Sequence, residues 1–156
     1  MSFDFNTALD TKANEVEKPP VLPQGNYIWR VSKAPVSSTS KSGEWSILEI
    51  PLICVSADDD VDPDDLEAYG PLDKTYNRVT FMAPTNAESE QEIQKTLYRL
   101  TQFLQETLRV DCEADATVKE MLANAMNCQM YATATWRPSD DGTDTYVDLK
   151  NYAPLD

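Results

Sequence analysis

The sequence contains no histidine. This excludes nucleophilic sites of the Ser-His-Asp or Cys-His type, a histidine general base and histidine metal ligands. The three cysteines, Cys54, Cys112 and Cys128, form no CxxC pair, and their odd number does not suit a disulfide framework. The four glycines are dispersed, so no glycine-rich phosphate loop exists. The sequence therefore predicts a protein that is not an enzyme, needs no cofactor and resides in a reducing cytoplasm.

Long apolar stretches are also absent, so no membrane span is expected. The first ten residues carry two acids and no basic residue, unlike a signal peptide. A length of 156 residues suits one domain with a single core. Taken alone, the net charge of -14 argues against binding to nucleic acid, because nucleic-acid-binding proteins usually present a basic surface.

The distribution of the charge weakens that argument. Residues 56–74 alone sum to -7, whereas the windows 25–55, 75–84 and 126–138 each sum to +1. These three positive windows coincide with segments that have the alternating pattern of β-strands. Negative charge is thus expected mainly in loops, helices and the tail.

Alternating apolar and polar residues predict five strands, over residues 27–33, 44–55, 74–81, 127–136 and 144–150. Because Pro51 cannot donate a ladder hydrogen bond, the second strand is expected at a sheet edge or at a bulge. Residues 37–43 are expected to form a flexible hairpin loop and residues 58–70 an acidic loop. Apolar residues spaced by three and four predict a helix that follows Thr85 or Asn86, and a shorter one over 117–125.

The predicted order is three strands, a helical insertion and two strands. This order suits a mainly β fold, a five-stranded Greek-key barrel of the OB type, which carries a helix between its third and fourth strands. The OB-like domain is expected over residues 25–150, with a short tail over 151–156. Residues 1–24, with three prolines near their end, are expected to form an extended arm. A small α+β sandwich is the alternative architecture.

One face of the predicted strands combines aromatic and basic side chains. Such a surface can stack bases and contact phosphates of a single-stranded nucleic acid, although aromatic residues also favour strands for packing reasons alone. Tyr27, Trp29 and Trp136 are assigned to the core. The candidate nucleic-acid-binding residues on the face opposite the core are Arg30, Trp45, Tyr76, Arg78, Tyr131, Tyr146 and Lys150, with Lys33, Lys41 and Arg137 at strand ends or in loops.

The opening of the predicted domain resembles phage-encoded OB-fold proteins. The similar segments are Leu22–Tyr27, Val31–Lys33, a polar loop of Ser, Lys and Gly, and Ile47–Ile50. The amphipathic helix and the final two-stranded hairpin are also similar, so the resemblance covers residues 22–149. Some of these phage proteins bind single-stranded DNA, and others are relatives found in replication modules. The resemblance implies sequence-tolerant binding of single-stranded DNA during replication or recombination in the host cytoplasm.

The chain departs from those proteins at its end. Many of them carry a long acidic tail with a terminal aromatic residue that recruits replication partners, whereas residues 151–156 are few and only mildly acidic. The acidic segment 58–67 is then the candidate surface for replication or recombination proteins. Asp58, Asp60 and Asp62 begin like a calcium loop, but Pro63 replaces the required glycine and Tyr69 the glutamate, so the segment fails that pattern.

Two other functions fit the same sequence. The charge of -14 suits an acidic protein-binding module, either a DNA mimic that occupies the DNA-binding site of an enzyme or a component of a virion or assembly scaffold. The oligomeric state stays open, because an edge strand over residues 44–55 could pair across a two-fold axis to form a homodimer. The preference for DNA or RNA stays open as well, because no motif reads a 2′-hydroxyl.

Overall fold

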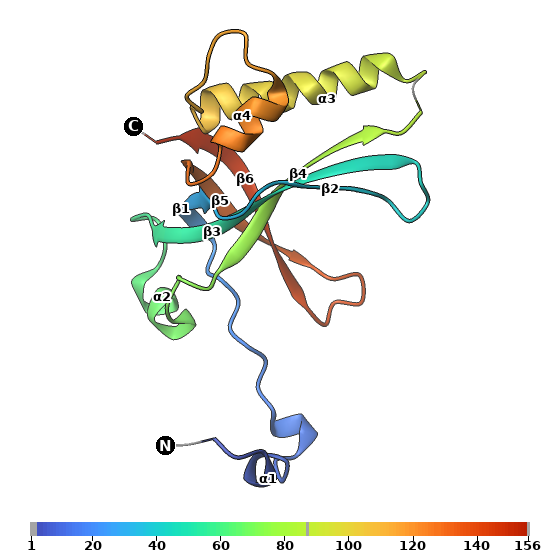
Figure 1. Ribbon diagram of the computed structural model, residues 1–156. Helices are drawn as coiled ribbons and strands as arrows, with labels where there is room; N and C mark the ends of the chain where they lie inside the picture. Colours follow the sequence, from blue (N-terminus) through green and yellow to red (C-terminus); the bar gives the residue numbers. More distant parts are fainter. Residues whose placement is uncertain (1–2, 87, 156) are drawn as a thin grey trace.

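The computed structural model describes residues 3–86 and 88–155. Its centre is one six-stranded antiparallel sheet, so the prediction of a mainly β fold is confirmed (Figure 1). The strand order is β2–β3–β1–β5–β6, and β4 pairs with the other side of β3. The strands are β1 (Gly25–Val31), β2 (Val36–Thr39), β3 (Trp45–Ala57), β4 (Tyr76–Pro84), β5 (Gln129–Pro138) and β6 (Thr145–Pro154).

Six short or medium helices accompany the described part of the sheet. They are α1 (Phe5–Ala8), the 3₁₀ turn η1 (Ala13–Glu15), α2 (Pro63–Tyr69), α3 (Glu90–Gln102), the π-helical turn η2 (Phe103–Thr107) and α4 (Val118–Asn124). In Figure 1, α3 and α4 lie together at the top of the molecule, and the N-terminal arm with α1 extends away from the opposite side. No helix of the described residues is long and apolar enough to cross a membrane.

The two helices predicted between the third and fourth strands are present, with different first residues. The α3 helix begins at Glu90 because Thr85 is still tied to the β2–β3 hairpin, donating its backbone N–H to the Glu44 carbonyl at 2.9 Å. The α4 helix begins directly after Thr117, whose side chain accepts a hydrogen bond from the Glu120 amide at 3.1 Å. A threonine in this position satisfies one of the free amides at a helix start.

The prediction of a flexible loop over residues 37–43 is wrong in its first half. Residues 36–39 form β2 and pair with residues 46–49 of β3. Backbone ladder hydrogen bonds to a long neighbouring strand override the weak strand preference of a serine-rich segment. The loop is reduced to a tight turn, in which the Gly43 amide donates to the Ser40 carbonyl at 2.9 Å.

The sequence predicts two alternatives for the second strand, a sheet edge or a bulge at Pro51. The edge position is wrong, because β3 has neighbours on both sides, and the register shift in its pairing with β1 falls at Val55 and not at Pro51. This strand pairs with β1 and β2 on one side and with β4 on the other. The Pro51 carbonyl accepts the Ser32 amide at 3.0 Å, so the missing donor of Pro51 faces the same side, where the chain passes from β1 to β2. Dimerisation through a free edge along the paired length of this strand is therefore excluded.

The segment expected as an acidic loop, residues 58–70, is half helical. Asp62 caps α2 by accepting the Asp64 amide at 2.8 Å, Pro63 occupies the first turn, and Gly70 ends the helix with a φ of +100°. These are ordinary signals of a helix start and stop. They explain why a run of acids adopts regular structure here.

The core lies on the face of the sheet that carries Tyr27 and Trp29, both fully buried as predicted. Their polar atoms are paired, since the Tyr27 hydroxyl donates to the Pro23 carbonyl at 2.6 Å and the Trp29 indole to Ala132 at 3.3 Å. Apolar residues of β3, β5 and the α3–η2 helix form about half of the rest of the core: Ile50, Leu52, Cys54, Leu100, Phe103, Leu104, Met130, Ala132 and Ala134.

The assignment of Trp136 to the core is wrong, because this residue is 49% exposed. Alternation along β5 puts it on the core face, but β5 continues beyond the end of the core. The indole instead holds the end of the arm and donates to the Leu22 carbonyl at 2.7 Å. At the other end of the last hairpin, β6 continues to Pro154, past the predicted strand end at Lys150.

We expect Gly25, the first residue of β1, to be intolerant of a side chain. Its φ is +143°, and an added Cβ would lie 2.6 Å from Cγ2 of the buried Val61. Gly142 is a matched control, because its φ is +73° and no atom lies within 4 Å of an added Cβ. In urea unfolding, Gly25→Ala is expected to lose about 1–3 kcal/mol more than Gly142→Ala, since overpacking adds to the backbone cost. Equal losses would show that the contact with Val61 does not limit this position.

Candidate functional site

The strands β4 and β6, which are the two ends of the path β4–β3–β1–β5–β6, approach each other at a seam. The side-chain amide of Asn77 on β4 donates to the Val147 carbonyl of β6 at 3.1 Å, across 70 residues of sequence. Above this contact lies a groove of about 610 Å³. We call it the seam groove, and its wall includes Tyr76, Asn77, Arg78, Thr80, Arg137, Tyr146, Asp148 and Tyr152.

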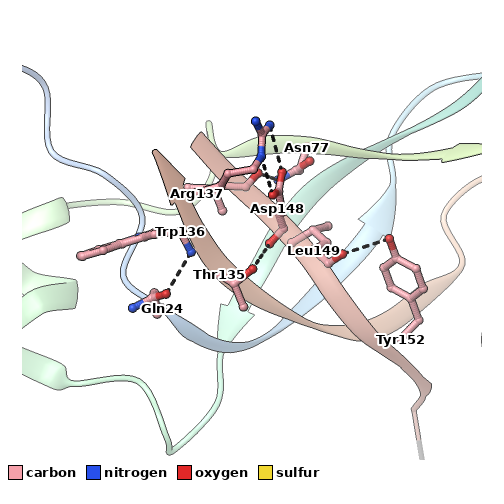
Figure 2. A network of polar contacts seen from close by, with 9 residues as sticks. Gln24, Asn77, Thr135, Trp136, Arg137, Asp148, Leu149 and Tyr152 are labelled. Carbon is pink, nitrogen blue, oxygen red and sulfur yellow. Dashed lines mark hydrogen bonds and ion pairs between the residues drawn. The ribbon is translucent and has the colours of Figure 1, made fainter. Parts of the chain in front are cut away.

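The β5–β6 side of the seam groove presents a cation stacked on an aromatic ring. Hairpin register places Arg137 opposite Tyr146, and its guanidinium carbon lies 4.9 Å from the ring centroid. Figure 2 shows the same guanidinium facing Asp148, with Nε 2.9 Å from Oδ2 and Nη2 3.5 Å from Oδ1. The hydrogen bond to Asp148 raises the pKa of Arg137. This side of the groove is a preformed unit of ring, cation and carboxylate.

The turn that sets this register is stabilised by its own hydrogen bonds. The Ser139 amide donates to the Asp144 carbonyl at 2.9 Å. Asp141 accepts hydrogen bonds from the Ser139 hydroxyl and from Thr143, which lower the pKa of its carboxyl to about 2. The turn is therefore held by an ionised carboxylate throughout the ordinary pH range, and it fixes Arg137 opposite Tyr146.

The β4 side of the seam groove presents a second pair of aromatic and basic residues. Tyr76 is 61% exposed, and Arg78 follows two residues later on the same face of the strand. The Arg78 guanidinium Nε lies 3.6 Å from Oε1 of Glu49 on β3. Tyr76, Arg78, Arg137 and Tyr146 thus line one groove, although they come from three strands.

The charges in this groove balance. Arg137 is paired with Asp148, and Arg78 is paired with Glu49. Both pairs are largely exposed, and such pairs are worth only about 0–1 kcal/mol in water. A phosphate group can therefore replace either carboxylate at low cost, but the nearby acids reduce the net attraction.

The other six predicted binding residues lie outside the seam groove. Arg30 on β1 is exposed and opposite Ile53 of β3, Tyr131 on β5 is half-buried opposite Ile28, and Lys150 on β6 is opposite Thr133. These three share the outer face of β1, β5 and β6.

The remaining three predicted binding residues lie around the β2–β3 hairpin. Lys33 follows β1, Lys41 occupies the turn between β2 and β3, and Trp45 begins β3 at 41% exposure. Both lysines are exposed, and within residues 3–86 and 88–155 neither forms an ion pair. These two lysines are thus exposed cations outside the seam groove.

Four of the named wall residues, Asn77, Thr80, Asp148 and Tyr152, are not among the binding residues predicted from the sequence. Asp148 was detectable, because the Ser139–Gly142 turn fixes the hairpin register that brings Arg137 close to it. Asn77 was assigned no role, and only the approach of β6 explains it. Tyr152 was assigned to the tail, because the last strand was predicted to end at Lys150. In the structure β6 continues through Tyr152, after an interruption of its register at Asn151, whose φ is +55°.

The acidic segment supports the start of β1. Asp60 accepts the Asn26 amide at 2.9 Å, and Asp58 accepts the Asn26 side-chain amide at 3.2 Å. Within the described residues, no group of three or more Cys, Asp or Glu could hold a metal ion. Burial raises the pKa of the Cys54 thiol to about 12, so this cysteine stays protonated and is a packing residue.

No protein-family model matches the sequence, and a search of curated proteins finds no match.

We expect the Asn77 contact to hold the seam closed. Asn77→Ala should lower the free energy of unfolding by about 0.5–1.5 kcal/mol, because it removes a half-buried hydrogen bond. Amide hydrogen exchange followed by mass spectrometry should show faster exchange in β6 around Val147. Thr80→Ala is the control, because Thr80 lies exposed on the same strand and its side chain makes no hydrogen bond within the described part of the chain. Unchanged exchange in β6 would contradict a structural role for Asn77.

Proposed function

We propose that the protein is a phage single-stranded-DNA-binding protein that acts with little sequence preference in replication or recombination. The proposal includes an OB-like barrel. The barrel is supported by the strand order, in which β1 pairs with β3 and β5 and β4 lies beside β3. The position of the main helix between β4 and β5 in the sequence also supports it. The Asn77 contact joins the two ends of that order, as closure of a barrel requires.

The location of the candidate residues also supports this proposal. OB folds bind oligonucleotides on the face of their second and third strands, between the loop that follows the first strand and the final hairpin loop. Here the corresponding strands are β3 and β4, which carry Trp45, Tyr76 and Arg78. The corresponding turns are the β2–β3 turn with Lys41 and the β5–β6 turn beside Arg137. In the view of Figure 1, both hairpins extend to the right of the sheet.

The observation that carries the proposal is the convergence of two aromatic–arginine pairs in the seam groove. Tyr76 and Tyr146 are 61% and 48% exposed; Arg137 covers one face of the Tyr146 ring, and the exposed part of each ring is open to stacking by a base. Arg78 and Arg137 lie beside them for phosphates. Along β4 alone, the six steps from Tyr76 to Met82 span about 20 Å at ~3.3 Å per residue, enough for several nucleotides.

The test is a titration of labelled oligo-dT, a duplex and an RNA of equal length. With about three to five phosphate contacts at ~0.7 each, single-strand affinity should fall with salt on a log–log slope of about -2 to -4. Tyr76→Leu and Tyr146→Leu should each weaken binding by about 1–3 kcal/mol, the usual value of one stacked base. The control is Tyr98→Leu, because Tyr98 is 64% exposed but lies on α3 outside the groove. A flat salt response, or equal losses in all three variants, would refute the proposal.

The balanced charges of the groove lead to a second prediction, of opposite sign. Asp148→Asn and Glu49→Gln should each strengthen oligo-dT binding by about 0.2–1 kcal/mol, because each frees an arginine from an exposed ion pair. Glu120→Gln removes the same charge from the exposed surface of α4 and is expected to have a smaller effect. The advantage of the groove variants should shrink in high salt. Equal gains from Glu120→Gln would mean that only the net charge matters.

One observation favours a different function, an acidic protein-binding module. Each arginine of the groove is already neutralised, whereas α2 carries the exposed acids Asp64, Asp65 and Glu67. A basic partner protein, such as a DNA-binding enzyme or a component of an assembly scaffold, is the ligand that such a surface fits. Failure to bind any oligonucleotide, together with inhibition of a DNA-binding enzyme, would support this function instead.

A further inference from the structure

A second pocket opens beside the seam groove, between β4 and the helix formed by α3 and η2. It has a volume of about 500 Å³ and shares Thr80 and Tyr152 with the seam groove. Its walls are mostly apolar and aromatic, including Phe81, Met82 and Phe103. The volume lies in the range of roughly 300–1,000 Å³ that is usual for sites of small organic groups.

Three aromatic rings gather in this pocket. The ring centroid of Phe103 lies 5.7 Å from that of Phe81 and 5.7 Å from that of Tyr152. Phe103 is buried, but Tyr152 is 40% exposed and offers its ring to the pocket. A flat aromatic ligand is the occupant that such walls accommodate best.

Two backbone irregularities place these rings. Phe103 begins the π-helical turn η2, in which its carbonyl accepts the Leu108 amide at 3.0 Å. Tyr152 follows Asn151, whose φ of +55° accompanies a shift of register between β5 and β6. π-Helical turns and strand irregularities are less stable than regular elements and recur beside binding sites. Both irregularities converge on one pocket, which favours a binding role over a packing defect.

The polar groups at the pocket are suited to a nucleotide. The Gln102 amide can pair with a base edge, and its nitrogen currently donates to the Tyr98 hydroxyl at 3.1 Å. Arg99 is exposed and donates to the Thr96 hydroxyl at 3.3 Å. Unlike Arg78 and Arg137, it forms no ion pair with any residue that the structure describes.

We infer that this pocket takes one unstacked base of a single strand whose neighbouring nucleotides lie in the seam groove. The base stacks on the Tyr152 ring, its edge meets Gln102 and Thr80, and Arg99 contacts an adjacent phosphate. This inference rests on the proposed function and extends it, because it gives the bound strand a fixed position. The continuity of the two cavities through Thr80 and Tyr152 is what permits one strand to occupy both.

The experiment places one abasic site at successive positions of the shortest oligo-dT that the full chain binds. Affinity should fall about tenfold at one position, where a stacked base is lost, and less elsewhere. Arg99→Gln should weaken binding of the intact oligo severalfold, and Tyr152→Leu should remove the dependence on the abasic position. Lys95→Gln is the matched control, since it removes one charge from an exposed side chain of the same helix.

The outcomes separate this inference from the proposal on which it rests. If the unchanged protein binds no oligonucleotide, both are refuted. If it binds, but every abasic position gives the same affinity and Arg99→Gln behaves like Lys95→Gln, only the base pocket is refuted. A peptide of residues 3–12, which carries the exposed Phe3 and Phe5, tests a protein ligand for the same pocket. If this peptide binds in an Arg99-dependent manner and does not displace the oligonucleotide, the pocket belongs to a protein segment. The inference is then overturned.

Discussion

The fold depends on β1, the strand that joins the two halves of the chain. It is hydrogen-bonded to β3 on one side and to β5 on the other, so it connects β2, β3 and β4 to the last hairpin. Its Tyr27 and Trp29 are fully buried with their polar atoms paired, which makes this strand both the centre of the ladder and the centre of the core. The acidic segment before α2 fixes its start through the Asn26 amide.

The seam groove is a consequence of that arrangement. With β1 in the middle, β4 and β6 lie at the two ends of the path β4–β3–β1–β5–β6, and within residues 3–86 and 88–155 the hydrogen bond from Asn77 to the Val147 carbonyl joins them. A partly closed sheet leaves side chains of both strands exposed along the gap. Aromatic and basic residues of β4 and of the last hairpin, at least 59 positions apart in sequence, thereby line one cavity, and the apolar pocket under α3 continues it.

The acidic character of the chain has two different physical roles. Some carboxylates are structural, since Asp60 and Asp62 satisfy backbone amides at the starts of β1 and α2. Others, Glu49 and Asp148, lie beside the two groove arginines and moderate their charge. The total of -14 therefore says little about the local field, which is set by which acid faces which base. Under the proposed function, these acids would compete with phosphate for the two arginines.

The sequence by itself determined the strands that alternate cleanly, the two helices before β5 and the burial of Tyr27 and Trp29, because these depend on local periodicity. It also contained the cap signals of α2, although the density of acids obscured them. Only the tertiary structure decided that Ser37–Thr39 form a strand, that β3 is internal despite Pro51, and that Trp136 is exposed. It alone brought Arg137, Arg78 and Tyr152 to one cavity, because strand neighbours, ladder ends and a register shift are set by contacts between residues distant in sequence. Periodicity predicts which residues share one face of a strand, but the elements packed around the strand decide whether that face is buried or exposed.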